Sequence, residues 1–330
     1  MENTGKEQSE QLRARKLLDL HKGGVDDFFK LWPPDKTYFF GSNNKAFIAY
    51  GVKRRVAVCM GDPVSSGRSI KLLLREFKQH CSDNGWVMIF IQTTDKFNEA
   101  YSLVGLKNIL IGADAVVDLN QFINTTVHNK YFRNIVNRFN KRQYSVTTNK
   151  PPHSIQLISE LRDVSNSWLT LPHRKEWSFL TGRFDPEYLQ QTVLYVLRDN
   201  TGRPQAFTNE LPSFKPGVFT IDLMRHKADS LPNSIDFLFI RLLQEKLREG
   251  YNSFNLGMSP LDGKQFTNNK MDKLLHQLYG LSNSFIGFKG LHQFKAKYRP
   301  EWEPRYVWYQ GSPLRIVQMG LAIYSLLKNG

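Results

Sequence analysis

The sequence predicts an α/β (α+β) protein built of two units, each a mixed, mostly antiparallel sheet flanked by helices. Short apolar segments of strand length open both halves, and each half continues with a segment of helical periodicity and a further apolar strand. Lys150, Pro151 and Pro152 interrupt the pattern midway. Of the residues, 41% are hydrophobic and 13% aromatic, which suits a packed core. We therefore expect one domain over residues 1–150 and another over residues 151–330.

In the first half, three short apolar segments separated by turn residues predict an antiparallel meander. An apolar periodicity of helical spacing follows and ends at Gly85. The expected strands are 37–40, 45–52, 55–60, 86–92 and 108–119, and the expected helices are 70–85 and roughly 97–106.

The second half repeats this order of elements without a repeat in the sequence itself. We expect helices at 154–169 and 234–248 and strands at 193–199, 205–211, 218–225 and 252–257. Antiparallel strands, helix, strand and helix in this order resemble the core of the GNAT acyltransferases. The resemblance implies two tandem GNAT-like domains, with catalysis in the second.

The charge balance points to polyanionic partners. Forty-five Lys and Arg against thirty Asp and Glu give a net charge of +15, which favours either nucleic acid or an anionic membrane surface. No apolar run approaches the roughly 20 residues that span a bilayer, and residues 1–15 lack the apolar stretch of a signal peptide. We expect a cytoplasmic protein, with Cys59 and Cys81 as buried free thiols.

Residues 130–142 predict an amphipathic helix with a basic outer face. Its apolar face is formed by Phe132, Ile135, Val136 and Phe139. Its cations are Lys130, Arg133, Arg138, Lys141 and Arg142, without acidic partners four residues away. Phosphate binding and a merely solvated surface helix are equally supported.

Asp222 and Arg225 end an apolar strand and are candidate site residues. Charged groups beside apolar neighbours are costly to bury unless each has a partner or a substrate. Side chains three apart on a regular strand point to opposite faces, so both reach one site only if the strand bends or ends there. A structural ion pair is the alternative.

Two C-terminal segments carry further hypotheses. Residues 288–300 interleave cations with aromatic residues, which suits stacking on bases or clamping phosphates, although a basic loop covering the core is equally consistent. His226 and His292 lie within these candidate segments, and a lone histidine is more often structural than catalytic. Residues 313–327 predict a helix with a broad apolar face that either closes the core or contacts a membrane.

Several familiar sites are missing from the sequence. It contains no Walker loop, no dinucleotide-binding glycine pattern after a strand, no His-Glu-x-x-His and no paired-cysteine zinc site, so we predict neither cofactor nor metal. The Arg/Gln-x-x-Gly-x-Gly/Ala loop with which ordinary GNAT enzymes hold acetyl-CoA is also missing. We therefore expect another acyl donor.

Six short motifs together resemble one family, the lysylphosphatidylglycerol and alanylphosphatidylglycerol synthases. They are Gly61-Asp62-Pro63, Gly182-Arg183-Phe184-Asp185, Ile221-Asp222-Leu223-Met224-Arg225, Asn255-Leu256-Gly257-Met258-Ser259-Pro260-Leu261, Gly290-Leu291 with Phe294-Lys295-Ala296-Lys297-Tyr298, and Pro304-Arg305-Tyr306. They occur in the family's order over roughly residues 28–309. Each is weak alone, and six in register are specific.

The resemblance implies a catalytic domain that moves an amino acid, lysine or alanine, from aminoacyl-tRNA to the hydroxyl of phosphatidylglycerol, an anionic phospholipid. The family's catalytic Asp and Arg fall on Asp222 and Arg225, and a lysine falls on Lys297, followed by Tyr298 in place of the usual Phe. Substrate-binding positions implied by the motifs are Arg183, His226, Asn255, Ser259, Lys295, Arg299 and Arg305. The family's acidic residue before Gly-Leu has no counterpart in residues 281–286.

Such a transfer exchanges one ester for another and needs positioning and charge stabilisation rather than ATP or metal. We expect Asp222 to orient or deprotonate the hydroxyl or to hold the ammonium group, Arg225 to clamp the lipid phosphate, and Lys297 to stabilise the oxyanion or hold the tRNA terminus. The location implied is peripheral, on the inner face of the cell membrane.

Three other functions remain open. A Fem-type transferase would aminoacylate a peptidoglycan precursor, and an acyl-CoA N-acyltransferase would need the missing pyrophosphate loop. A non-catalytic module that binds tRNA or anionic lipid would tolerate the loss of Asp222.

Overall fold

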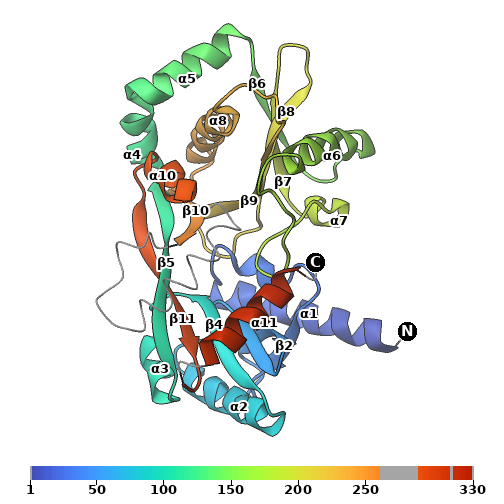
Figure 1. The fold of residues 1–330 in the computed structure, drawn as a ribbon, viewed down its shortest axis with the longest axis vertical. Coiled ribbons are helices and arrows are strands. Elements are labelled where there is room, and N and C mark those ends of the chain that lie inside the picture. Colours follow the sequence, from blue (N-terminus) through green and yellow to red (C-terminus); the bar gives the residue numbers. More distant parts are fainter. Residues whose placement is uncertain (1, 261–288, 313–314, 329–330) are drawn as a thin grey trace.

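The computed structural model describes residues 2–260, 289–312 and 315–328, and eleven strands of these residues form one continuous sheet (Figure 1). The strand order is β1-β2-β3-β4-β11-β5-β10-β9-β8-β7-β6. The strands are β1 (Thr37–Phe40), β2 (Phe47–Lys53), β3 (Val56–Met60), β4 (Val87–Thr93), β5 (Lys107–Asp118), β6 (Ser145–Asn149), β7 (Val193–Arg198), β8 (Pro204–Glu210), β9 (Val218–His226), β10 (Ser253–Pro260) and β11 (Glu301–Tyr309).

Helices cover both faces of this sheet. They are α1 (Glu2–His21), α2 (Ile70–Asp83), α3 (Asn98–Leu103), α4 (Leu119–Asn124), α5 (Lys130–Lys141), α6 (Ile155–Leu169), α7 (Pro186–Leu189), α8 (Ser234–Arg248), α10 (Lys289–Ala296) and α11 (Ile316–Lys328), with short 3₁₀ turns η1 (Asp27–Lys30) and η2 (Thr126–His128). None of these described helices is both long and apolar enough to cross a bilayer.

The predicted fold class is confirmed. In the first half, α2 connects β3 to β4, and in the second half α8 connects β9 to β10, and the two strands are parallel in each case. The other described strand pairs are antiparallel, including the expected β1-β2-β3 meander. A parallel pair needs a crossover of this kind, which is why both long apolar helices follow directly on a meander.

Local sequence signals set several helix ends. The side chains of Asn129 and Ser154 accept hydrogen bonds from the backbone of the first turns of α5 and α6. Gly85, with φ of +68°, follows α2 and adopts a left-handed conformation that glycine tolerates without strain.

Strands β3 and β7 are buried on both faces, which explains why apolar and polar residues do not alternate along them. On β3, Val56 and Val58 pack in the cluster that contains α11, whereas Ala57 and Cys59 pack toward α2. β7 behaves in the same way in the second half, with Tyr195 facing α8. A strand buried on both faces reads as a continuous apolar run.

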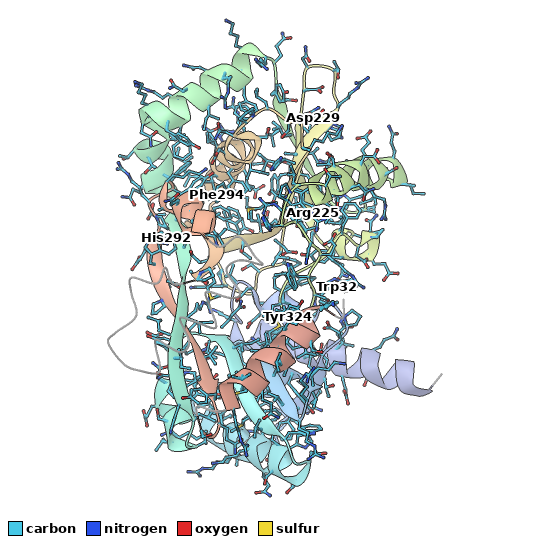
Figure 2. The ribbon with its side chains drawn as sticks, viewed as in Figure 1. Trp32, Arg225, Asp229, His292, Phe294 and Tyr324 are labelled. Carbon is cyan, nitrogen blue, oxygen red and sulfur yellow. The ribbon has the colours of Figure 1, made fainter. Side chains whose placement is uncertain are left out.

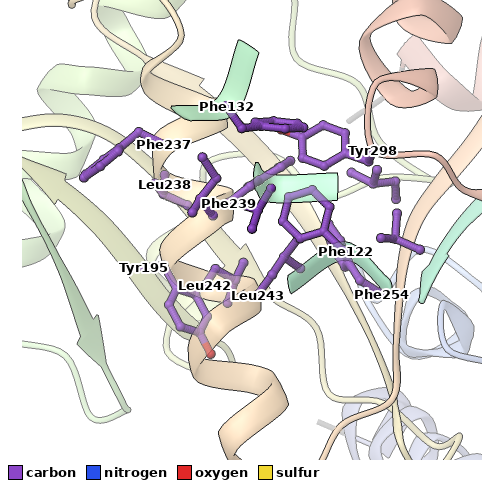
Figure 3. Packing of buried hydrophobic residues seen from close by; sticks show 14 of the residues in the cluster. Phe122, Phe132, Tyr195, Phe237, Leu238, Phe239, Leu242, Leu243, Phe254 and Tyr298 are labelled. Atoms are coloured by element: carbon purple, nitrogen blue, oxygen red, sulfur yellow. The ribbon is translucent and has the colours of Figure 1, made fainter. Parts of the chain in front are cut away.

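The largest core cluster of the described residues forms where α8 of the second half packs against α4 and α5 of the first half and against α10. Phe237 stacks on Phe139 with ring centroids 4.7 Å apart, and Phe239 lies 6.0 Å from Tyr298 (Figure 3). This cluster anchors the apolar face of α5, as its periodicity predicts. Cys59 and Cys81 are buried free thiols, also as expected.

Several elements escaped the sequence analysis, among them α1, β6 and β11. Helix α1 reads as a polar lead, yet Ala14, Leu17 and Leu18 are buried. Strand β6 is short and polar, and β11 contains Pro304 and two glutamates. β11 tolerates Pro304 because its pairing with β4 begins only at Tyr306.

The sheet is continuous across the expected boundary at residue 150. β6 precedes the boundary and pairs with β7, whereas β11 follows it by 150 residues of chain and lies between β4 and β5. Strand order alone does not decide folding units, so the division into residues 1–150 and 151–330 stays a prediction.

Candidate active site

A bulge in β9 brings Asp222 and Arg225 to the same side of the sheet. The register runs from Thr208↔Met224 to Glu210↔Ile221, so β9 uses one residue more than β8 over this stretch. The backbone N–H of Leu223, inside the bulge, donates to the Asn209 side chain at 2.8 Å. Such an insertion reverses the alternation of side chains along the strand. The strand is therefore irregular between Asp222 and Arg225, which is the condition under which both side chains can reach one site.

Asp222 lies in a partly exposed position at the base of the loop that precedes α7. Its Oδ2 atom accepts hydrogen bonds from the Tyr188 hydroxyl at 2.6 Å and from the Gly182 backbone N–H at 2.9 Å. Burial raises the pKa of Asp222 to about 6, against the opposing effects of Tyr188 and of the nearby Arg225 charge. Among the described residues no donor reaches its Oδ1 atom, which leaves that oxygen for a substrate.

Arg225, labelled in Figure 2, is 3% exposed. Its planar fork is already occupied. Its Nη1 and Nη2 atoms donate to the two carboxylate oxygens of Glu176 at 2.7 and 2.6 Å, and Nη1 also donates to Ser165 Oγ. The guanidinium lies over the Trp168 ring, 4.7 Å from its centroid. A lipid phosphate would have to displace Glu176 to bind this fork, so the structure favours a supporting part for Arg225 over the predicted clamp.

β9 and β10 separate next to these residues. The two strands pair over Ser253↔Val218, Phe254↔Phe219 and Asn255↔Thr220, and their ladder then stops although both strands continue. The opening lies between the Asp222 segment on β9 and residues 257–259 on β10.

Lys295 of α10 stands behind the β10 side of this opening. It is buried, and its Nζ atom donates to the carbonyls of Gly257 and Met258 at 2.8 and 2.9 Å. Burial lowers the pKa of Lys295 to about 8. Lys295 therefore supplies a buried positive charge next to the bulged backbone of β10, where Gly257 has a φ of +76°.

A cavity of about 650 Å³ lies among the loops of both halves, near the meeting point of β5, β10 and β11. Asn255 and Arg305 line it, and both bind the buried carboxylate of Asp114. Asp26 also lines the cavity, and burial raises its pKa while the Arg305 charge opposes the shift. Asn255 and Arg305 thus form one network with Asp114, which holds the wall of the cavity.

Lys297 does not join Asp222 and Arg225 among the described contacts. Its Nζ atom forms an ion pair with Asp236 of α8 and lies 3.3 Å from the hydroxyl of Tyr131 on α5. Burial lowers the pKa of Lys297, and Asp236 opposes the shift. The structure places Lys297 on the α5 side of α8, so a direct part in the reaction stays an untested prediction.

The basic helix α5 presents most of its cations to solvent, as predicted. Lys130, Arg133, Lys141 and Arg142 are exposed. Arg138 is the exception, because it donates to the Pro232 carbonyl at 2.6 Å and to Asn233 at 2.8 Å and so ties α5 to the start of α8.

The other predicted substrate-binding residues are scattered. Arg183 is partly exposed beside Gly182, and Arg299 is exposed after α10 with a φ of +53°. His226 contacts the Lys227 carbonyl and Ser230, which suits a structural histidine, and Ser259 is buried at the end of β10. Residues 281–286, which lack the family's acidic residue, lie outside the described part of the chain.

Sequence reasoning missed Glu176, Tyr188 and Trp32. Tyr188 holds Asp222, and the Trp32 ring stacks on Tyr188 with centroids 6.0 Å apart. A weak signal existed for Glu176, the single acid in the basic stretch 173–176. Nothing in the sequence links Trp32 to residue 188, since the contact spans more than 150 residues.

The model of the family described as "Phosphatidylglycerol lysyltransferase, C-terminal" matches residues 16–309. The chain belongs to this family. The resemblance inferred from six motifs is therefore confirmed, and the match begins twelve residues earlier than the motifs indicated.

Relatives in the family are similar over most of this chain. The phosphatidylglycerol lysyltransferase of Bacillus subtilis is 34% identical over 278 residues, covering 84% of this chain and 32% of that protein. The Staphylococcus aureus enzyme is 30% identical over 282 residues, covering 85% and 33%. The chain thus spans about a third of the length of these curated relatives.

Solved structures of the family share the fold throughout. L-PGS from Bacillus licheniformis matches with a TM-score of 0.82 at 30% identity, covering 94% of this chain and 96% of that one. The C-terminal domain of a putative lysylphosphatidylglycerol synthetase from Agrobacterium fabrum matches with a TM-score of 0.83 at 28% identity, covering 98% of both. FemX, at 8% identity and a TM-score of 0.56, shares the fold alone.

Proposed function

We propose that this chain transfers an amino acid from aminoacyl-tRNA to a hydroxyl of phosphatidylglycerol, with Asp222 as the general base. The observation that carries the proposal is the bulge in β9, which places Asp222 beside an opening in the sheet with one carboxylate oxygen committed and the other available. The names of the family and of its relatives supply the lipid and the kind of reaction.

The reaction balances without a cofactor. Asp222 takes the proton from the lipid hydroxyl, whose oxygen attacks the carbonyl carbon of the aminoacyl ester. The bond from that carbon to the ribose oxygen of the tRNA then breaks, and protonated Asp222 returns its proton to the ribose oxygen. A carboxylate with a pKa of about 6 is largely ionised near neutral pH and still accepts a proton readily, which suits both steps.

The surrounding residues hold this base in place. Tyr188 and the Gly182 N–H fix Oδ2, and the positive charge of Arg225 keeps the pKa of Asp222 from rising further. Glu176 binds Arg225 and fixes its fork. In this proposal Arg225 is a positioning residue and Lys295 contributes positive charge on the β10 side of the opening, where negative charge develops on the attacked carbonyl.

The exposed cations of α5 form the proposed tRNA-binding surface. Four of them project from one helix without acidic partners in the described structure, which is the arrangement that phosphate backbones favour. The aminoacyl-tRNA then supplies the donor, and the anionic lipid, reached at the inner face of the cell membrane, supplies the acceptor.

The direct experiment supplies purified protein with each charged tRNA in turn and with phosphatidylglycerol vesicles. The expected product is an aminoacylated lipid, and its identity decides between lysine, alanine and another amino acid. Product in a peptidoglycan precursor instead would make the chain a Fem-type transferase, and product only from acyl-CoA would make it an N-acyltransferase. Binding of tRNA or lipid without any product would contradict the enzymatic proposal.

A further inference from the structure

Helix α11 has two apolar faces, of which one is buried. Met319 and Ala322 are 1% and 0% exposed and pack against β3 and β4 together with Phe179. The helix therefore closes the core, which was one of the two interpretations of its sequence. Its other face bears on the second interpretation, which was contact with a membrane.

The outer face carries an apolar stripe. Val317, Leu321 and Tyr324 follow one another at helical spacing and are 50%, 47% and 50% exposed. They are not isolated, because the Trp177 ring packs edge-on against Tyr324 with centroids 6.3 Å apart. The exposed surface is thus continuous from α11 to the segment that precedes α7.

Exposed cations surround this stripe. The turn between β2 and β3 adjoins α11, since the Gln318 side chain donates to the Arg54 carbonyl at 2.8 Å. The cations are Arg54 and Arg55 on this turn, Arg315 and Lys328 at the two ends of the helix, and Arg174 and Lys175 beside Trp177. None of the six forms an ion pair with a described residue, and residues 310–328 contain no Asp or Glu.

The same segment leads from this face to the candidate active site. Glu176 binds Arg225, and its neighbour Trp177 contacts α11. Two residues further, Phe179 is buried against α11, and the Ser178 N–H donates to the Leu327 carbonyl at 3.0 Å. The segment ends at Gly182, whose N–H binds Asp222. Five peptide bonds therefore separate Trp177, next to the exposed stripe, from Gly182, which binds the proposed base.

We propose that Val317, Leu321, Tyr324 and Trp177, with the six surrounding cations, dock the chain on the surface of an anionic lipid bilayer. Apolar insertion combined with attraction to anionic headgroups is the pair of signals that reversible attachment needs. Docking in this way brings residues 176–182, and so the Asp222 side of the molecule, toward the headgroups. The inference depends on the proposed function only in that the acceptor is a lipid.

The test uses the whole chain and vesicles of equal parts phosphatidylglycerol and phosphatidylcholine. The variant Val317→Glu/Leu321→Glu/Tyr324→Glu is compared with Leu72→Glu/Leu103→Glu, whose side chains on α2 and α3 are 46% and 56% exposed. We expect co-sedimentation to fall by about tenfold or more for the α11 variant and to stay at the parental level for the control. Thermal unfolding of both must match the parent, since all these side chains are half exposed.

A charge variant, Arg55→Ser/Lys175→Ser/Arg315→Ser, tests the rim. We expect it to weaken sedimentation at low salt and to reduce the difference between anionic vesicles and vesicles of phosphatidylcholine alone. Equal sedimentation of parent and α11 variant, or no sedimentation of the parent, would overturn the proposal. A parent that is dimeric by sedimentation velocity and an α11 variant that is monomeric, with no vesicle binding, would make this face a protein interface instead.

Transfer assays separate docking from chemistry. With short-chain phosphatidylglycerol dispersed as single molecules, the α11 variant should work as fast as the parent, whereas with vesicles it should be slower. If no form of the lipid is aminoacylated, the proposed function fails while vesicle binding still decides the docking proposal. Equal turnover of variant and parent on vesicles would show that docking at α11 does not serve the reaction.

Discussion

The two parallel strand pairs of the sheet are built alike and end differently. β3 and β4 stay paired through five positions, from Val56↔Val87 to Met60↔Ile91, whereas β9 and β10 pair through three and then separate. Beside each pair lies a carboxylate bound by a tyrosine hydroxyl, Asp62 with Tyr101 in the first half and Asp222 with Tyr188 in the second.

The two carboxylates differ in how many of their oxygen atoms are bound by neighbouring residues. Asp62 Oδ2 accepts from the backbone N–H and the hydroxyl of Thr94, just past the end of β4, while its Oδ1 atom accepts from Tyr101. Both oxygens are thus used to hold the closed strand ends together. In the open half the described residues bind only the Oδ2 atom of Asp222. The same kind of carboxylate therefore serves structure in one half and is available for chemistry in the other.

The largest expected effect separates these two carboxylates. Asp222→Asn should lower the rate of aminoacyl transfer by about 10²–10⁴-fold, because an amide cannot accept the hydroxyl proton. Asp62→Asn should instead lower the free energy of unfolding by about 1–3 kcal/mol. The NH₂ group of the new amide would face hydrogen-bond donors that the carboxylate oxygens now accept from. Transfer rates and denaturant unfolding of both variants decide this, and reversed results would exchange the two assignments.

A second prediction concerns the close approach of Gly182 to the base. A Cβ atom at this position would collide with Asp222 Oδ2 and with the Tyr188 ring. Gly182→Ala should therefore displace Asp222 and lower the rate by about 10²-fold. Gly67→Ala in the first half is the matched control, since nothing lies within 4 Å of its added methyl group. Similar rates for the two variants would show that the position of Asp222 is not critical.

The pH dependence tests the electrostatics of the open half. Because the pKa of Asp222 is raised to about 6, the rate should be at its plateau well above pH 6 and should fall as the pH drops through 6. The Arg225 charge lowers this pKa and the Glu176 charge raises it. Arg225→Gln should therefore shift the acid limb of kcat/KM to higher pH and Glu176→Gln to lower pH, and shifts in one common direction would contradict the arrangement.

The smallest expected effect compares the cations of α5 with exposed cations elsewhere in the first half. Arg133→Glu/Lys141→Glu/Arg142→Glu on α5 should weaken tRNA binding and reduce the slope of log affinity against log salt by roughly one unit for each tRNA phosphate that the helix no longer binds. The control is Lys16→Glu/Arg75→Glu/Lys107→Glu, which reverses three exposed cations of the first half. Filter binding at several salt concentrations gives both slopes. Equal slopes for the α5 variant and the control would show that α5 is a solvated surface helix that does not bind tRNA.

Much of the fold was predictable because its signals are local. The strand at Thr37–Phe40 and the helix at Ser234–Arg248 have the predicted bounds, and most other elements differ by one to three residues. Strand β11 was not predictable in the same way, because Pro304 and two glutamates obscure it. Its place between β4 and β5 depends on contacts that cross most of the chain.

The candidate site shows the same limit. Motif resemblance located Asp222, Arg225 and Lys297, but it could not tell which of them lie together. The bulge in β9 unites the first two, and α8 holds the third through Asp236. Whether Lys297 takes part in the reaction is therefore a matter for experiment.

The fold class, the family and the basic face of α5 could be predicted from the sequence, because periodicity, charge and short motifs are properties of neighbouring residues. Three features appeared only in the three-dimensional packing: Glu176 occupies the fork of Arg225, Tyr188 holds Asp222, and α11 buries one apolar face and exposes another. These outcomes depend on which distant segments pack together. The burial of a side chain and the partners of a charge are set there, and no local pattern encodes them.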